Sequence, residues 1–150
     1  MPKRELIGKE TEATTVMIDP AKSSEFAKVV GELDPLYHDI EAARRAGYPN
    51  LLAPPTYPIA FMAESMNPEL FFELELNLPS IVHGEQEFLY FQPIVTGQAL
   101  TMKGRIADMW EKVGRSGTLD FVVMEAAASD ANGQPVYTSR LTLISKRATE

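Results

Sequence analysis

The sequence has no cysteine and only two histidines, His38 and His83. Without cysteine the chain can form no disulfide, thiolate zinc site or iron–sulfur cluster, and it can use no cysteine nucleophile. Two histidines are too few for a multi-histidine metal centre, so we expect no metal and no cofactor. Any chemistry must then come from carboxylates, histidine, tyrosine, hydroxyl groups or backbone dipoles.

Positive charge and long apolar runs are also scarce. The 150 residues include 14 Lys and Arg against 21 Asp and Glu, and the formal net charge of −7 disfavours a nucleic-acid partner. No apolar run approaches the ~20 residues of a membrane span, and the first residues lack the apolar stretch of a signal peptide. With 45% hydrophobic residues, the chain suits one ordinary domain. We expect a single cytoplasmic domain over residues 1–150, with neither nucleic acid nor membrane as partner.

The first half of the chain predicts one short strand and three helices. Alternating apolar residues predict a strand over 14–18. The helices are predicted after the candidate N-caps Asp19, Asp39 and Thr56, over 21–30, 40–46 and 56–66.

Two of these helices have a distinct apolar pattern. The helix over 21–30 has Phe26, Val29 and Val30 on one face. The helix over 56–66 has Glu64 as its one charged residue and should be largely buried.

The second half predicts long strands. Residues 88–91 are apolar on both faces, alternation marks a strand around 100–106, and Asn132-Gly133 is a strong hairpin signal before a run over 136–146. Four long antiparallel strands after a buried helix predict an α+β fold. In that fold the antiparallel sheet wraps around one central helix.

The densest cluster of reactive side chains lies between the first two predicted helices. Three carboxylates, a phenol and an imidazole occur there, which can act as general acids and bases: Glu32, Asp34, Asp39, Tyr37 and His38. A structural interpretation is also open. Asp34-Pro35 is an ordinary turn, Asp39 an ordinary N-cap, and Tyr37 can pack with its hydroxyl in water.

The order of these motifs resembles the MaoC-like hot-dog hydratases and dehydratases of acyl thioesters. Their loop signature G-D-x-N-P-[IL]-H-x-D, followed by A-x-x-x-G, is matched here at Gly31, Pro35, Leu36, Asp39, Ala43 and Gly47. The segments 82–88 and 91–97 resemble the second-strand signature of the same family. More narrowly, the segments 53–56 and 83–86 are similar to the N-terminal dehydratase branch, which includes substrate-holding subunits of (3R)-hydroxyacyl-ACP dehydratases. The resemblance covers residues 8–145 and implies a single hot-dog fold.

The catalytic positions depart from that family. Its loop aspartate and the histidine two places past N-P form a dyad that moves the α-proton of the thioester and holds the reacting water. These positions hold Glu32 and Tyr37 here, and His38 follows one residue later. Glutamate is one methylene longer, and tyrosine, with an ordinary pKa of ~10, is a poor base near neutral pH. The resemblance therefore implies a degraded catalytic site made of Glu32, Tyr37 and His38.

Three interpretations follow from this degraded dyad. In the one we favour, the chain is the substrate-binding half of a dimeric hydratase or dehydratase, and a second hot-dog subunit supplies the intact dyad. In the second, it is a self-sufficient homodimeric hydratase that uses Glu32 and His38. In the third, it is a non-catalytic acyl-thioester-binding or assembly module.

These interpretations share an acyl-CoA or acyl-ACP thioester as ligand and a homodimer or heterodimer as the assembly. The first two make the chain a hydro-lyase or a subunit of one, which we favour. A thioesterase is disfavoured because it would need a carboxylate on the central helix, where Glu64 is the sole candidate.

The remaining parts of the pocket follow from the chemistry of the thioester. Its oxygen becomes negative during the reaction, and backbone N–H groups at a helix N-terminus stabilise such charge. Prolines at 54 and 55 lack N–H groups, which leaves Thr56 and Tyr57 as donors. The predicted substrate-binding residues are Asp34, Pro55, Thr56, Tyr57, His83 and Gly84.

Some of these residues also have structural interpretations. The prolines can simply fix the angle at which the helix begins, and His83 can be a structural hydrogen-bonding residue beside Gly84. Trp110 is expected at an interface, at the rim or half-buried. The residues expected in the core or tunnel wall are Phe61, Met62, Met66, Phe71 and Phe72.

Overall fold

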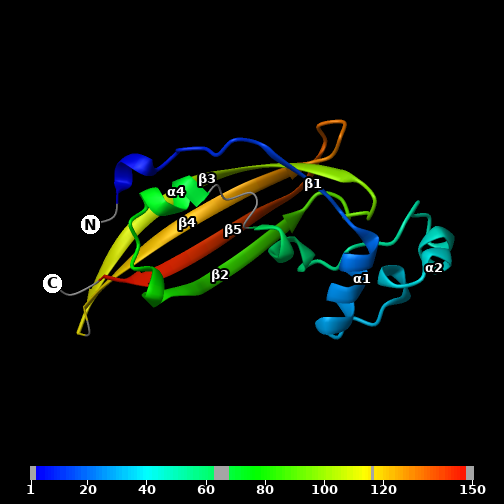
Figure 1. The fold of residues 1–150 in the computed structure, drawn as a ribbon, viewed down its shortest axis with the longest axis horizontal. Coiled ribbons are helices and arrows are strands. Elements are labelled where there is room, and N and C mark those ends of the chain that lie inside the picture. Colours follow the sequence, from blue (N-terminus) through cyan, green and yellow to red (C-terminus); the bar gives the residue numbers. More distant parts are fainter. Residues whose placement is uncertain (1–2, 63–67, 116, 148–150) are drawn as a thin grey trace.

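A single five-stranded antiparallel sheet forms the body of the molecule. The computed structural model describes residues 3–62, 68–115 and 117–147. The strand order is β1-β3-β4-β5-β2, and every neighbouring pair is antiparallel (Figure 1). The strands are β1 (Thr14–Met17), β2 (Ile81–Tyr90), β3 (Ala99–Gly114), β4 (Gly117–Ser129) and β5 (Pro135–Lys146). The predicted antiparallel sheet is therefore confirmed, although β2 begins earlier than its apolar run suggested.

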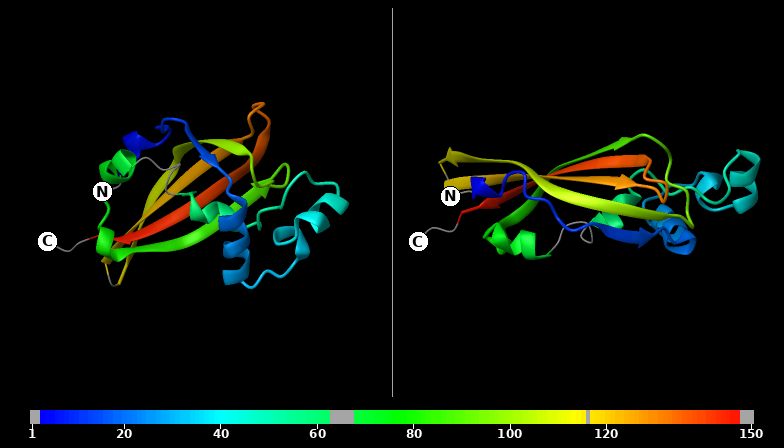
Figure 2. Two further views of the ribbon diagram at one scale, coloured as in Figure 1. Left: turned by 45° about the vertical axis from the view of Figure 1, so that its right-hand side comes forward. Right: turned by 90° about the horizontal axis from the view of Figure 1, so that it is seen from above.

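The helices are short and lie mainly on one face and beyond one end of the sheet. They are α1 (Pro20–Val29), α2 (Ile40–Arg45) and α4 (Pro68–Glu73), with 3₁₀ turns η1 (Arg4–Leu6), η2 (Pro35–Tyr37), η3 (Tyr57–Ala60) and η4 (Leu78–Ser80). Seen from above, α1 and α4 lie on the same side of the sheet, and α2 extends past the strand ends (Figure 2).

Local capping signals set the ends of α1 and α2 as predicted. Asp19 accepts hydrogen bonds from the backbone N–H groups of Ala21 and Lys22, and the Asp39 carboxylate accepts one from Glu41. Gly31 (φ +78°) and Gly47 (φ +94°) follow the helices in the left-handed conformation that glycine adopts without strain.

The apolar face of α1 is buried only in part, because Phe26 packs against the core while its other two apolar residues do not. Ser23 and Ala27 are its buried residues, whereas Val29 and Val30 are 80% and 51% exposed. Within the last turn, Ala27 is fully buried and Phe26 packs on Tyr57, so the buried side of the helix does not include Val29.

The predicted helix over 56–66 differs in its described part. Residues 57–60 form the 3₁₀ turn η3, Thr56 makes no side-chain cap, and Ile59 is 40% exposed. A 3₁₀ turn rotates successive side chains further than an α-helix does, which moves Ile59 off the buried face. Residues 63–67, which include Glu64 and Met66, lie outside the described residues.

The helix α4 was not predicted from the sequence. It begins at Pro68, and proline is favoured at the first position of a helix. Phe71 is half-buried, but Phe72 is 66% exposed, contrary to the expectation that it lines the core.

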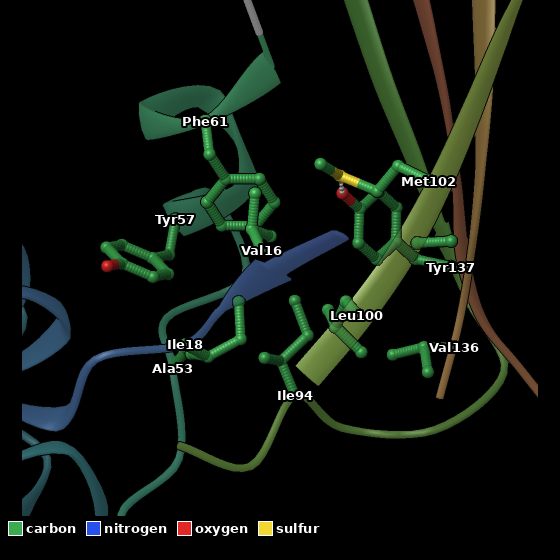
Figure 3. Packing of buried hydrophobic residues seen from close by; sticks show 11 residues of the cluster. Val16, Ile18, Ala53, Tyr57, Phe61, Ile94, Leu100, Met102, Val136 and Tyr137 are labelled. Carbon is green, nitrogen blue, oxygen red and sulfur yellow. Dashed lines mark hydrogen bonds between the residues drawn. The ribbon is translucent and has the colours of Figure 1, made fainter. Parts of the chain in front are cut away.

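Two apolar clusters cover the inner face of the sheet. The first joins the sheet to η3 (Figure 3), and the Tyr57 ring meets Phe26 and Phe61 edge-to-face at centroid distances of 5.4 and 5.6 Å. The second lies beneath α4, where Leu70 and Leu74 pack on residues of β3, β4 and β5. Trp110 lies on the opposite face, where it stacks on Phe121 and is 37% exposed.

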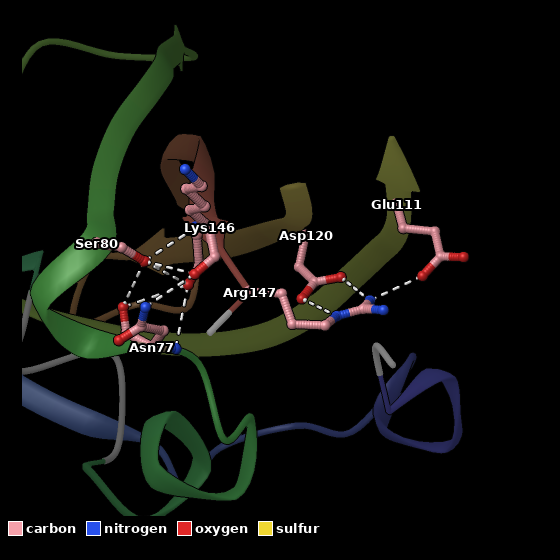
Figure 4. Close-up of polar contacts among 7 residues, drawn as sticks. Asn77, Ser80, Glu111, Asp120, Lys146 and Arg147 are labelled. Carbon is pink, nitrogen blue, oxygen red and sulfur yellow. Dashed lines mark hydrogen bonds and ion pairs between the residues drawn. The ribbon is translucent and has the colours of Figure 1, made fainter. Parts of the chain in front are cut away.

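Polar contacts fasten the far end of the sheet (Figure 4). The Asn77 side chain donates to the Lys146 carbonyl at 2.9 Å, and the Lys146 N–H donates to Ser80 Oγ at 3.0 Å. Arg147 Nε donates to Asp120 at 3.1 Å and its Nη2 donates to Glu111 at 2.8 Å. The two carboxylates raise the pKa of Arg147. The bonds of Asn77 and Ser80 to Lys146 tie the segment before β2 to the end of β5.

Buried phenols make the stability of this fold sensitive to alkali. Burial raises the pKa of Tyr90 and of Tyr137 well above the ordinary value of ~10. The folded chain keeps these protons at a pH where the unfolded chain releases them, so the free energy of unfolding should fall as pH rises above ~10. In urea titrations over a pH series, Tyr137→Phe should reduce this slope by about 1.4 kcal/mol per pH unit. An unchanged slope would contradict the prediction.

Candidate functional site

The loop between α1 and α2 brings four of the predicted site residues together. Its carboxylates are engaged locally: Glu32 Oε1 accepts from the Asp34 N–H at 3.0 Å, and Asp34 Oδ1 accepts from the Leu36 N–H at 2.9 Å. Asp34 thereby caps the 3₁₀ turn η2, as the structural interpretation of the motif predicted.

His38 is held through both of its ring nitrogens. Nε2 lies 2.8 Å from the Glu32 carbonyl oxygen, and Nδ1 lies 2.9 Å from Ser24 Oγ on α1. A carbonyl oxygen only accepts, so Nε2 carries the proton, and in the neutral ring Nδ1 accepts from the Ser24 hydroxyl. The lone pair that a general base would use therefore faces Ser24. The geometry makes His38 a tie between the loop and α1.

Tyr37 occupies the position where the related signature has histidine. Partial burial raises the pKa of Tyr37, and the neighbouring carboxylates of Glu32 and Asp34 raise it further. The phenol therefore keeps its proton at neutral pH. It can donate a hydrogen bond there, but it cannot serve as a base.

The segment that leads into η3 is tied to this loop, because the Leu52 N–H donates to the Leu36 carbonyl at 3.0 Å. The Tyr57 N–H, however, donates to the Pro54 carbonyl at 2.9 Å, so this predicted donor is already used within the turn. The carbonyl of Pro55 accepts from the Tyr90 hydroxyl on β2. Thr56 is exposed and keeps its N–H without a hydrogen bond within the described part of the chain.

A cleft of about 580 Å³ opens between β1, α1 and η3. Its lining mixes apolar with polar and charged side chains: Thr15, Val16, Met17, Lys22, Glu25, Phe26, Val29, Tyr57, Ala60 and Phe61. Tyr57 is the one predicted substrate-binding residue in this lining. Burial, together with the carboxylate of Asp19, raises its pKa, so its phenol also keeps its proton.

His83 and Gly84 lie apart from the loop, on the half of β2 that is farther from α1. His83 is exposed and lies opposite Leu143 of β5. A strand rises ~3.3 Å per residue, so about 23 Å of β2 separates His83 from Tyr90. Gly84 forms a bulge, where an added Cβ would lie 2.9 Å from Ile144 Cδ1 and 3.0 Å from the Thr142 carbonyl oxygen.

Two residues of the site were not foreseen from the sequence. Ser24 holds His38 from 14 positions earlier in the chain, and Tyr90 holds the Pro55 carbonyl from 35 positions later. No local motif encodes such pairs, because the fold alone brings them together.

No group of three His, Asp or Glu side chains among the described residues is arranged to hold a metal ion. None of the described helices is long and apolar enough to span a membrane.

Comparisons with known proteins give a family model and similar proteins. Residues 5–139 match the family model described as "FAS1-like, dehydratase domain region". A UPF0336 protein of Saccharopolyspora erythraea is 32% identical over 146 residues, which cover 96% of this chain and 91% of that protein.

Solved structures share the fold. The HadBC (3R-hydroxyacyl-ACP dehydratase) complex from Mycobacterium tuberculosis contains a chain with a TM-score of 0.76 and 24% identity, covering 90% of this chain and 92% of that one. A MaoC-like dehydratase gives a TM-score of 0.83 at 22% identity; the match covers 95% of this chain but 43% of that one. The predicted hot-dog fold is confirmed by these likenesses.

The hydrogen bond between His38 and Ser24 predicts that Ser24 contributes to stability and that the neighbouring Ser23 does not. Ser24→Ala should lower the free energy of unfolding by about 1 kcal/mol, because it removes a half-buried hydrogen bond. Ser23→Ala is the matched control: Ser23 Oγ is buried without a hydrogen-bond partner in the described part of the chain, so its removal should cost nothing. Urea denaturation measures both variants. NMR of the imidazole nitrogens should show His38 protonated at Nε2, and an Nδ1-protonated ring would contradict the assignment.

The bulge at Gly84 predicts a structural requirement for glycine. Gly84→Ala should lower the free energy of unfolding by about 1–3 kcal/mol, because the new methyl group meets Ile144 and the β5 backbone. Gly114→Ala in β3 serves as the control, since its Cβ has ordinary contact distances, and it should change stability by less than about 0.5 kcal/mol. Equal effects in the two variants would be the opposing result.

Proposed function

The chain belongs to the family described as FAS1-like, dehydratase domain region, and we propose that it is the substrate-binding half of a dimeric acyl-thioester dehydratase or hydratase. The observation that carries the proposal is the state of the loop. His38 has both ring nitrogens occupied, and the Glu32 carboxylate is bound to the Asp34 N–H. A second hot-dog subunit would then supply the intact acid–base dyad.

The chemistry of the reaction supports this division of labour. A general base needs a free lone pair within about 2.6–3.2 Å of the proton that it removes. In this loop Tyr37 keeps its proton, and the Nδ1 lone pair of His38 points at Ser24. The loop therefore suits holding and shaping a site better than abstracting the α-proton of a thioester.

We assign the cleft beside Tyr57 to the acyl part of an acyl-CoA or acyl-ACP substrate. Its volume of about 580 Å³ lies within the usual range of small-molecule sites, and Val16, Phe26 and Phe61 supply apolar walls on which an acyl chain can pack. In this proposal Tyr57 contacts the substrate through its protonated phenol. Asp34, Pro55, Thr56, His83 and Gly84 stay predictions, and the last two lie on β2, which a partner strand can approach.

The known structures support a second subunit by analogy. The related HadBC structure is a complex described as a (3R)-hydroxyacyl-ACP dehydratase. The MaoC-like dehydratase matches this chain over 43% of its length, so more than half of that chain has no counterpart here. We propose that this chain forms one hot-dog unit over residues 1–150 and acts as a subunit of a hydro-lyase in the cytoplasm.

The second interpretation is a homodimeric hydratase that uses Glu32 and His38. It requires Nδ1 of His38 to leave the Ser24 hydroxyl before the imidazole can act as a base. The third interpretation, a non-catalytic acyl-thioester-binding or assembly module, requires no such change.

Hydration of crotonyl-CoA, followed by the loss of enoyl-thioester absorbance, separates these interpretations. The isolated chain should be inactive, and co-purification with a hot-dog chain that carries an intact G-D-x-N-P-x-H loop should raise the rate at least ~100-fold, the usual scale of acid–base catalysis. Substitution of that chain's loop histidine should abolish the gain.

The opposing result is activity of the isolated chain that Glu32→Gln and His38→Ala each reduce at least ~100-fold. Glu41→Gln, on the exposed face of α2, is the matched control for a lost carboxylate near the loop. If the paired chains are also inactive while the isolated chain binds the thioester, the non-catalytic interpretation holds and the proposal fails.

A further inference from the structure

The strand β2 forms one edge of the sheet and is ten residues long. It pairs with β5 on one side, and no strand of the described residues pairs with its other side. An unpaired edge of this length exposes backbone N–H and C=O groups to a strand of another chain. The partner strand that it accepts then depends on its side chains.

The side chains of β2 make this edge acidic. Glu85 lies opposite Thr142 and Glu87 opposite Arg140 on β5, and both glutamates are exposed. Directly opposed residues share a face, so the two glutamates point to the outer face of the sheet, away from the core side where Phe88 packs. Arg140 pairs with Glu125 at 3.5 Å, and β2 itself contains neither lysine nor arginine.

Exposed apolar side chains accompany these charges. Val82 and Leu89 on β2 are 55% and 54% exposed, and Phe91 just after it is 55% exposed. Apolar exposure on both flanks of the two glutamates is typical of a strand that is covered by another subunit.

A second copy of this chain fits the edge poorly. If two copies of β2 paired about a two-fold axis at Gln86, each Glu85 would lie opposite the Glu87 of the other copy. A two-fold axis at Glu85 would place Glu85 opposite Glu85 of the other copy, and an axis at Glu87 would do the same for Glu87. Like charges directly opposed across strands are destabilising, and the net charge of −7 on each chain adds longer-range repulsion.

We propose that this edge selects, as the second subunit, a hot-dog chain whose edge strand carries lysine or arginine opposite Glu85 and Glu87. The same charges disfavour a homodimer. That the partner is a hot-dog subunit rests on the proposed function. The preference for a basic partner strand, called the charge rule below, rests on the sequence and pairing of β2.

The test uses a charge-reversed copy of this chain as the basic partner. Sedimentation velocity at low ionic strength compares the full wild-type chain, the Glu85→Lys/Glu87→Lys variant, and an equimolar mixture of the two. Each separate sample should be mainly monomeric, because its opposed charges are alike. The dissociation constant of the mixed dimer should be at least ~10-fold lower than that of either chain with itself. Added salt should weaken the mixed dimer.

A matched control removes the effect of net charge. Glu5→Lys/Glu12→Lys changes the net charge equally, but both residues are exposed in the N-terminal segment, which runs along the opposite edge of the sheet. Its mixture with the wild-type chain should not dimerise more tightly than the wild type alone. The proposal is overturned if the wild-type chain forms a homodimer as tight as the mixed dimer, or if the control mixture dimerises equally well.

This measurement needs no enzyme activity, so its outcome is separate from that of the hydration assay. Inactive chains that still show the charge rule would refute the proposed function alone. An active heterodimer without the charge rule would refute the edge proposal alone.

Discussion

Burial of one apolar face of the sheet is the constraint on which the rest of the structure depends. Antiparallel strands alternate their side chains, so one face of β3, β4 and β5 is lined by residues such as Leu100, Ile106 and Val122 that are almost completely buried. The short helices cover this face from its two ends, with α1 and η3 over one cluster and α4 over the other. The candidate site lies at the end covered by α1 because the loop after α1 must return to the sheet there.

The loop itself is stabilised by its polar side chains. In a segment without regular structure, backbone N–H groups need other acceptors, and here carboxylates of the reactive cluster supply them. Glu32, Asp34 and Asp39 each accept from a nearby backbone N–H, and the His38 ring spans the loop from Ser24 to the Glu32 carbonyl. A side chain that performs these structural tasks has fewer lone pairs and protons to offer to a substrate. The altered loop motif and the geometry of the loop both favour a structural use of these side chains.

The sequence predicted those parts of the molecule that local physics decides. Asp19 and Asp39 cap helices because a short acidic side chain reaches the first free N–H groups, and Asn132-Gly133 turns a hairpin because glycine tolerates a positive φ there. Strand alternation likewise predicted the antiparallel sheet.

The features that the sequence did not predict depend on tertiary contacts. The buried residues of α1 are Ser23 and Ala27, and the apolar pattern of the helix did not identify them. The pairing of His38 with Ser24 and the distance of His83 from the loop depend on the folded path of the chain.

The bulge at Gly84 changes which residues of β2 face the core: Ile81 does so before it, and the even-numbered Phe88 and Tyr90 do so after it. If β2 shifted its register on β5, a residue with a side chain would replace Gly84 and would clash with β5. The bulge therefore fixes the register of an edge strand that could otherwise pair in more than one register.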